Sequence, residues 1–201
     1  MTKSQLQKHK YIDKRIGLLG GSFNPAHDGH VQMSLFALKR LKLDEVWWLV
    51  SPQNPLKNKD EMKSLEARYS YAQKHVAHQK KIVVKRVEEA YGTTFTHEIL
   101  TALKEDFLQT KFVWLMGEDN LKTVHLWKKW HQIFLCMPIA VFRRKGYSNA
   151  RLESVAEAVY AEAKLPLASA KKLVDLKPPS WMVLDNEFNP ESATRIRTLK
   201  K

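Results

Sequence analysis

The chain has 201 residues, of which 44% are hydrophobic and 10% aromatic, which is enough apolar surface for a folded domain and too much for a disordered chain. A single cysteine excludes an internal disulfide. The longest apolar stretch, 133–142, contains Pro138 and is about half the roughly 20 residues that a membrane-spanning helix needs. The basic first residues lack the apolar core of a secretory signal. We therefore expect a cytoplasmic protein with no membrane partner.

The charge of the chain is strongly positive, with 34 Lys and Arg against 21 Asp and Glu and a formal net charge of +13. Such a field attracts phosphate-rich partners, including nucleotides, RNA and anionic membranes. The basic residues occur as scattered pairs and form no single block. We interpret most of them as a solvated surface, since charge alone does not choose among these partners.

Short runs rich in Val, Ile and Trp alternate with longer segments of helical spacing. The runs predict buried strands at 16–20, 46–50, 82–87, 112–116, 139–142 and 182–184. The segments between them predict helices at 30–41, 65–80, 95–107, 121–133 and 152–163. In the first helix the expected buried face is formed by Val31, Leu35, Leu38 and Leu41. Prolines 166, 178 and 179 predict a loop over 164–180 that leads into the last strand.

This alternation of strand and helix predicts a Rossmann-like α/β fold, an open parallel sheet covered by helices on both faces. Parallel strands need long crossovers, and each helix buries its apolar stripe on the sheet. We expect a single domain over 15–201, preceded by a basic segment, 1–14, whose order the sequence leaves open. Ligands of such sheets bind beyond the carboxyl ends of the strands, so the loops after the strands are the places to search.

The most informative loop runs from Gly20 to His30, between the first strand and the first helix. It has neither the G-x-G-x-x-G of dinucleotide-binding folds nor the P-loop pattern. Gly20 and Gly21 allow a ligand to approach the backbone, while His27 and His30 stand at a helix start that favours anions. These features predict a phosphate site with imidazole donors. The alternative is that the two histidines cap the helix or bind a metal through their spacing.

The same loop carries a resemblance to a known family. Gly20-Gly21-Ser22-Phe23-Asn24-Pro25, followed by His27-Asp28-Gly29-His30, resembles the G-G-S-F-N-P-x-H-x-G-H signature of the bacterial nicotinate-nucleotide adenylyltransferases. Further stretches resemble later motifs of that family, at 52–57, 94–96, 117–120, 127–130, 144–147 and 192–197. Two positions depart from the family pattern, because Phe95 and Ala193 each lack a hydroxyl group found there.

The resemblance implies an enzyme that transfers the adenylyl group of ATP to nicotinate mononucleotide, with Mg²⁺ as cofactor and no metal site of its own. Catalysis would consist of positioning and charge stabilisation, because the attacking phosphate is already an anion. His30 would donate to the α-phosphate and His27 to its neighbours, and both would be catalytic. The implied ATP-binding residues are Gly20, Gly21, Ser22, Phe23, His27, His30, Ser192, Thr194 and Arg197.

The implied acceptor-binding residues are Lys57, Thr94, Thr96, Asp119, Trp127 and Arg144. Trp127 would stack on the pyridine ring, the two threonines would face its carboxylate, and the two cations would hold phosphate groups. Asp119 would bind a ribose hydroxyl or a water of the magnesium shell. Simpler interpretations stay open for these side chains: a turn-capping aspartate, a tryptophan of the core and solvated cations.

Other functions were weighed against this one. Pantetheine-phosphate adenylyltransferases share the H-x-G-H motif but resemble the chain less, and the R-[ST]-x-G-x-S-T-[ST] motif of cytidylyltransferases is missing from it. Nicotinamide mononucleotide as the acceptor differs by one amide group. An RNA-binding module without catalysis would explain the charge and the six tryptophans, but most of these lie in patterns that indicate burial, so we expect no specific nucleic-acid partner. A homo-oligomer is left open.

Overall fold

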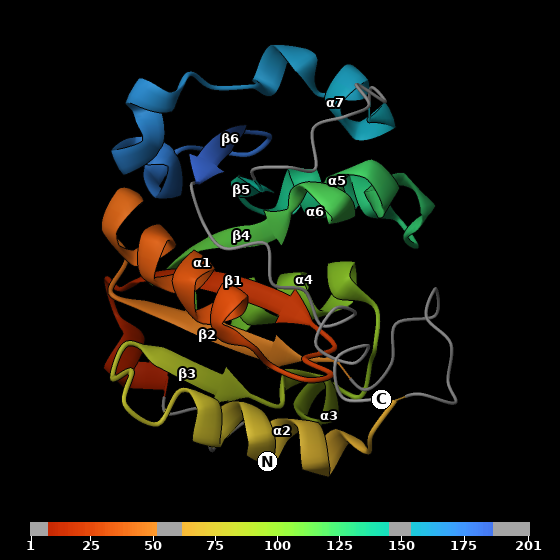
Figure 1. The fold of residues 1–201 in the computed structure, drawn as a ribbon. Coiled ribbons are helices and arrows are strands. Elements are labelled where there is room, and N and C mark those ends of the chain that lie inside the picture. The colour runs from red at the N-terminus through yellow and green to blue at the C-terminus, as the bar shows by residue number, and fades with distance from the viewer. Residues whose placement is uncertain (1–7, 52–61, 145–153, 187–201) are drawn as a thin grey trace.

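The computed structural model describes residues 8–51, 62–144 and 154–186. Its centre is a parallel sheet of six strands in the order β3-β2-β1-β4-β5-β6 (Figure 1). The strands are β1 (Arg15–Gly21), β2 (Glu45–Val50), β3 (Ile82–Lys85), β4 (Lys111–Gly117), β5 (Ile139–Arg144) and β6 (Trp181–Asn186). Neighbouring strands are parallel throughout. The predicted Rossmann-like α/β class is confirmed.

Helices connect the strands and cover both faces of the sheet (Figure 1). They are α1 (Asp28–Arg40), α2 (Leu65–His75), α3 (Val87–Tyr91), α4 (Thr96–Asp106), α5 (Glu118–Thr123), α6 (Trp130–Cys136) and α7 (Val155–Val159). Short 3-10 helices are η2 (Lys8–Tyr11), η3 (Val124–Leu126), η4 (Ala161–Ala163) and η5 (Leu167–Asp175). Strand residues alternate between two hydrophobic clusters, so that Trp47 packs on one side of the sheet and Trp48 on the other.

The strand order reverses beside β1, which positions the functional site. From β1 the chain proceeds outward to β2 and β3, and it then returns to β4 on the other side of β1. The loops that leave β1 and β4 therefore diverge from adjacent carboxyl ends, as in other open sheets with a ligand crevice. Leu19 of β1 is in register with Leu115 of β4. The Gly20–His30 loop and the Gly117–Asn120 turn consequently begin side by side.

Several predicted helices and one predicted strand have different bounds in the structure. The strand predicted over 82–87 ends at Lys85, because Val87 already begins α3. The single helix predicted over 121–133 is wrong. The chain instead forms α5, η3 and α6, and the break before α6 is at Lys129, whose φ of 50° is left-handed. The helix predicted over 152–163 divides into α7 and η4, and the predicted loop over 164–180 contains η5.

The buried face of α1 differs from the prediction at one position. Leu41 is buried, and Val31 and Leu38 pack partly buried against the core as predicted, but Leu35 is 43% exposed. The helix also buries Met33, Ser34 and Ala37. The reason is polar: Ser34 is needed in the interior by the indole of Trp48, which donates a hydrogen bond to it. An apolar count could not find this face, because a serine occupies its centre.

Part of the basic segment 1–14 packs against the domain. Tyr11, in η2, is 4% exposed and its ring lies edge-on to Trp47, with ring centroids 4.8 Å apart. Its carbonyl also accepts a hydrogen bond from Thr110 Oγ1 at 2.6 Å. Residues 1–7 lie outside the described part of the chain. The division at residue 14 therefore stays a prediction, but Tyr11 packs into the core of the domain.

Candidate active site at the carboxyl ends of β1 and β4

The loop after β1 is shaped by Phe23. Its φ is 44°, and the Asn24–Pro25 peptide that follows is cis. The Phe23 side chain is 2% exposed and stacks on Trp48, with ring centroids 4.8 Å apart and an interplanar angle of 17°. This aromatic anchor fixes the loop against β2 and directs the chain into α1, which begins at Asp28.

His27 and His30 lie together at the start of α1. Their ring centroids are 3.8 Å apart, and the Nδ1 atom of His30 accepts a hydrogen bond from the backbone N–H of His27 at 3.3 Å. A ring nitrogen that accepts carries no proton, so the proton of the neutral His30 ring is on Nε2. His27 is 4% exposed, while His30 is half-buried. The pair thus presents imidazole donors where the free N–H groups of a helix start already favour an anion.

A second set of contacts, from Ser34 of α1 and Trp48 of β2, holds the backbone at His30. Ser34 Oγ donates to the His30 carbonyl at 2.8 Å and accepts from Trp48 Nε1 at 2.8 Å. Because Trp48 also stacks on Phe23, one buried indole links the loop and the first turn of α1. These partners were not found from the sequence, and the signal for them was weak: a serine amid the apolar positions of α1.

Gly20 and Gly21 differ in how much room the structure leaves for a side chain. A Cβ at Gly20 would lie 2.3 Å from Cη2 of Trp114, whereas one at Gly21 would meet only the Phe23 ring, at 3.4 Å. Gly20 is therefore required by close packing between β1 and the Trp114 indole. Close approach of a ligand to the backbone, which the sequence suggested for both, stays a prediction.

The turn after β4 places a carboxylate beside this loop. Gly117 ends β4, and Glu118 and Asp119 begin α5. A Cβ at Gly117 would lie 2.3 Å from Asp119 Oδ1, so the Asp119 side chain folds back over the glycine into space that no other residue type leaves open. Asp119 itself is exposed. The absence of a side chain at Gly117 thus leaves room for this carboxylate at the end of β4.

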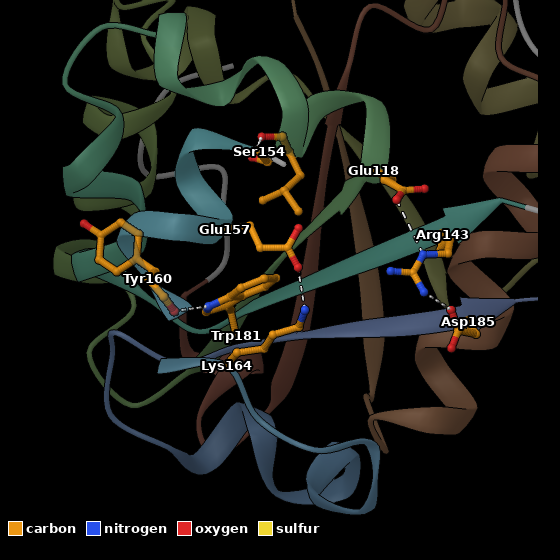
Figure 2. A network of polar contacts seen from close by, with 9 residues as sticks. Glu118, Arg143, Ser154, Glu157, Tyr160, Lys164, Trp181 and Asp185 are labelled. Carbon is orange, nitrogen blue, oxygen red and sulfur yellow. Dashed lines mark hydrogen bonds and ion pairs between the residues drawn. The ribbon is translucent and has the colours of Figure 1, made fainter. Parts of the chain in front are cut away.

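Arg143 links the carboxyl ends of β4, β5 and β6 (Figure 2). From β5, its guanidinium contacts Glu118 Oε1 at 3.4 Å and Asp185 Oδ1 at 3.0 Å. The contact with Glu118 holds the first residue of α5, next to Asp119. Nearby, Ser154 Oγ donates to the Leu121 carbonyl at 2.7 Å and attaches the segment before α7 to α5. Sequence reasoning chose the neighbouring Arg144 and missed Arg143.

The chain is similar to known proteins along most of its length. A model of the cytidylyltransferase-like family matches residues 18–199. A probable nicotinate-nucleotide adenylyltransferase from Erythrobacter litoralis is 46% identical over 183 residues, which cover 91% of this chain and 83% of that one. One from Parvibaculum lavamentivorans is 44% identical, covering 91% and 90%. The chain belongs to the nicotinate-nucleotide adenylyltransferase family.

A solved structure agrees on the fold of this adenylyltransferase family member. The nicotinic acid mononucleotide adenylyltransferase of Plasmodium falciparum, complexed with NaAD, has a TM-score of 0.68 and 17% identity, covering 92% of this chain and 83% of the other. At that identity the likeness shows the fold. The predicted family, the enzyme class and the adenylyl-transfer reaction are confirmed by the curated relatives.

Elements predicted to bind the acceptor of the adenylyltransferase come together around the start of α4. Thr96 is the first residue of α4, Thr94 is exposed just before it, and half-buried Trp127 packs against the core beside it. Lys128 Nζ lies 3.7 Å from the centroid of the Phe95 ring, which joins the W-x-x-W turn to this helix start. Sequence reasoning did not single out Lys128, although the tryptophans on either side of it marked the turn.

Other predicted residues of the adenylyltransferase lie where the structure gives no account of their side chains. Lys57 and the late motif of Ser192, Thr194 and Arg197 are outside the described residues, and Arg144 ends β5 with its side chain outside the description. Their roles stay predictions. Among the described residues, no helix is long and apolar enough to cross a membrane.

Proposed function

We propose that this chain transfers the adenylyl group of ATP to the phosphate of nicotinate mononucleotide, forming nicotinate adenine dinucleotide and pyrophosphate. The observation that carries the proposal is the His27–His30 pair at the start of α1, beside the point where the strand order reverses. Relatives at 46% and 44% identity are named for this activity. We also propose the cytoplasm as its compartment, because both substrates are nucleotides of the cell interior.

The chemistry suits a site built from donors. A phosphate oxygen of nicotinate mononucleotide attacks the α-phosphorus of ATP in line and forms a new P–O bond. The bond between the α-phosphorus and its bridging oxygen breaks, and pyrophosphate leaves with that electron pair. The nucleophile is already an anion, so no general base is required. His30, through its Nε2–H, would stabilise charge on the α-phosphate, and His27 charge on the neighbouring phosphates.

The remaining contacts to ATP come from backbone and from the late motif. Gly20 and Gly21 end β1, and the backbone N–H groups of Ser22 and Phe23, which follow directly, would donate to phosphate oxygens. Ser192, Thr194 and Arg197 would complete the triphosphate site with hydroxyl groups and a guanidinium. These assignments rest on the motif together with the position of the first loop.

Acceptor binding is assigned to the surface around the start of α4. Trp127 would stack on the pyridine ring, while Thr94, Thr96 and the first N–H groups of α4 would face its carboxylate. Lys128, held over Phe95, adds positive charge at that helix start. Lys57 and Arg144 would hold the phosphate groups of the acceptor or of the leaving pyrophosphate.

We also propose Mg²⁺ as the cofactor of the reaction. Within the described ranges no cluster of three or more His, Cys, Asp or Glu side chains could hold a metal. Mg²⁺ is commonly held by one or two carboxylates together with substrate phosphates, and Asp119 supplies one carboxylate at the crevice. The residues therefore fit an ion that arrives with ATP, which would neutralise phosphate charge and help pyrophosphate to leave.

Pyrophosphate release tests the proposal. Purified chain would be assayed with ATP and Mg²⁺ and one of three acceptors: nicotinate mononucleotide, nicotinamide mononucleotide or phosphopantetheine. We expect the acid to give the highest kcat/KM and His30→Ala to lower kcat by about 10²–10³. Preference for phosphopantetheine or for the amide would contradict the assigned acceptor. Loss of activity with every acceptor in folded protein would contradict the reaction itself.

A further inference from the structure

Arg68 is a buried cation that connects the loops of the nucleotide site. It belongs to α2 and is 2% exposed. Its guanidinium donates to three backbone carbonyls: Nη1 to Ser22 and to Ser51, the latter at 2.7 Å, and Nε to Lys63 at 2.9 Å. One side chain thereby joins the segment after β1, the segment after β2 and the residue before the N-cap of α2.

The contact with Ser22 determines how the loop after β1 faces the crevice. In a trans peptide the C=O and the following N–H point in opposite directions. The Gly21 carbonyl accepts from Ser51 N–H at 2.9 Å, on the β2 side, so the Ser22 N–H points toward β4. The Ser22 carbonyl points to Arg68, so the Phe23 N–H points away from the buried guanidinium. The Ser22 N–H therefore points away from β2, and the Phe23 N–H points away from Arg68.

A second tie reinforces the same connection. Asn24 Oδ1 accepts a hydrogen bond from the Lys63 N–H at 3.3 Å, and Asn24 is itself 7% exposed. The loop is therefore fastened to the start of α2 both before and after Phe23. An apolar residue at position 68 would fill the volume but would leave three part-buried carbonyls without these donors.

We infer that Arg68 is a positioning residue for ATP: it orients the Ser22–Phe23 peptide so that its N–H donates to the phosphates in the crevice. The inference rests on the proposed function, because it takes ATP as the ligand of that loop. Arg68 acts through the backbone of the loop and does not contact the substrate. Its loss should therefore weaken ATP binding selectively, beyond any general loss of stability.

The test compares Arg68→Lys with Val76→Ala. Val76 is the buried C-cap of α2, at the opposite end of the helix from Lys63, so its truncation removes packing without removing a hydrogen bond to the loop. Equilibrium binding of a non-hydrolysable ATP analogue would be measured by calorimetry, and KM would be measured separately for ATP and for nicotinate mononucleotide. Circular dichroism and thermal unfolding would establish that each variant is folded.

We expect Arg68→Lys to raise the analogue Kd and the KM for ATP by about tenfold, which corresponds to about 1.4 kcal/mol, with the acceptor KM changed by less than about twofold. An unchanged Kd in folded Arg68→Lys, or an equal increase in Val76→Ala, would overturn the inference. If Arg68→Lys does not fold, Asn24→Ala decides: weaker analogue binding supports the role of the ties, and unchanged binding overturns it.

The two measurements separate this inference from the proposed function. Analogue binding needs no acceptor. The unmodified chain could therefore fail to adenylate any acceptor while Arg68→Lys still weakens analogue binding. That result would contradict the proposed reaction and support the role of Arg68. If the unmodified chain turns over normally and Arg68→Lys changes neither the analogue Kd nor the KM for ATP, the proposed reaction stands and the role of Arg68 is contradicted. A chain that neither binds the analogue nor turns over would contradict both.

Discussion

His27 selects the tautomer of His30: its backbone N–H donates to Nδ1 of the His30 ring at 3.3 Å. The residue that caps α1 therefore leaves the Nε2 proton of its neighbour available for a ligand. The positive end of the dipole of α1 adds to the attraction of this helix start for an anion. The H-x-G-H spacing places both histidines on one turn, and the cap converts that spacing into a donor of defined orientation.

His30→Ala should lower kcat with little effect on folding. Removal of one preorganised donor to a developing charge costs about 2.7–4 kcal/mol, or about 10²–10³ in kcat, and His30 is half-buried at the surface of the crevice. Steady-state pyrophosphate release measures the loss. His78→Ala, at an exposed site outside the proposed machinery, serves as the control and should keep full activity. A kcat for His30→Ala within a few-fold of the unmodified chain would rule out a catalytic role.

Ser34 and Trp48 should be energetically coupled. Ser34→Ala leaves the buried Trp48 N–H without its acceptor, and we expect a cost of about 1–3 kcal/mol in the free energy of unfolding. Trp48→Phe removes the donor but keeps a ring against Phe23. Urea unfolding of both single variants and of the double variant should give a coupling energy of about 1 kcal/mol. Additive effects would show that the hydrogen bond between these two side chains contributes nothing to stability.

Gly117→Ala should impair activity more than stability. Its Cβ would occupy the position of Asp119 Oδ1, and the carboxylate can swing away at small energetic cost while leaving the crevice. We expect kcat/KM to fall by about tenfold or more, a loss of about 1.4 kcal/mol, and the melting temperature to change little. Pyrophosphate release and thermal unfolding would be measured on the same sample.

Gly92→Ala is the matched control, since a Cβ there meets no atom within 4 Å but the φ of 65° is left-handed. It should lose about 1–2 kcal/mol of stability and retain its kcat/KM. Equal activity losses in the two variants would mean that the position of the Asp119 carboxylate does not matter to turnover.

The sheet could be predicted because its strands are short, continuous and apolar. The run Val46–Val50 is buried on both faces, so its hydrophobicity is unbroken and its position is clear from composition alone. The segment 121–136 could not be predicted in the same way. Its apolar residues are spaced as in one helix, yet Lys129, whose backbone is left-handed, divides it. A lysine does not by itself indicate a left-handed backbone conformation.

The phosphate loop could be located because Gly20 to His30 carries its chemistry in one contiguous motif. Arg68 and Arg143 act through tertiary contacts with segments distant in sequence, such as Ser22 and Glu118. The only sign of Arg68 in the sequence was its position, because it is a charged residue beside the apolar Leu65 and Tyr69 of α2. Its partners are backbone carbonyls, which no side-chain pattern can reveal.

The stability of the chain should fall as the pH is lowered through the range in which histidine titrates, and His97 should contribute to that fall. His97 is 3% exposed at the start of α4, and burial lowers the pKa of its ring below the ordinary 6.5, against a smaller opposing effect of Glu98. Glu98 Oε1 lies 3.6 Å from Nε2, while the charges of Lys128 and Lys129 lower the pKa further. The folded protein therefore holds this ring neutral.

Below about pH 6.5, His97 binds a proton in the unfolded chain but stays neutral in the folded protein. The free energy of unfolding therefore decreases as the pH falls. For this one group the decrease is at most about 1.4 kcal/mol per pH unit. Urea unfolding between about pH 5.5 and pH 7.5 should show a smaller pH dependence in His97→Leu than in the unmodified chain. His78→Ala, at an exposed site, should retain the original dependence. The pKa of Glu98 is lowered by its hydrogen bond from Thr93, so that carboxylate changes charge below this range. An unaltered slope in His97→Leu would show that the buried ring is not the group responsible.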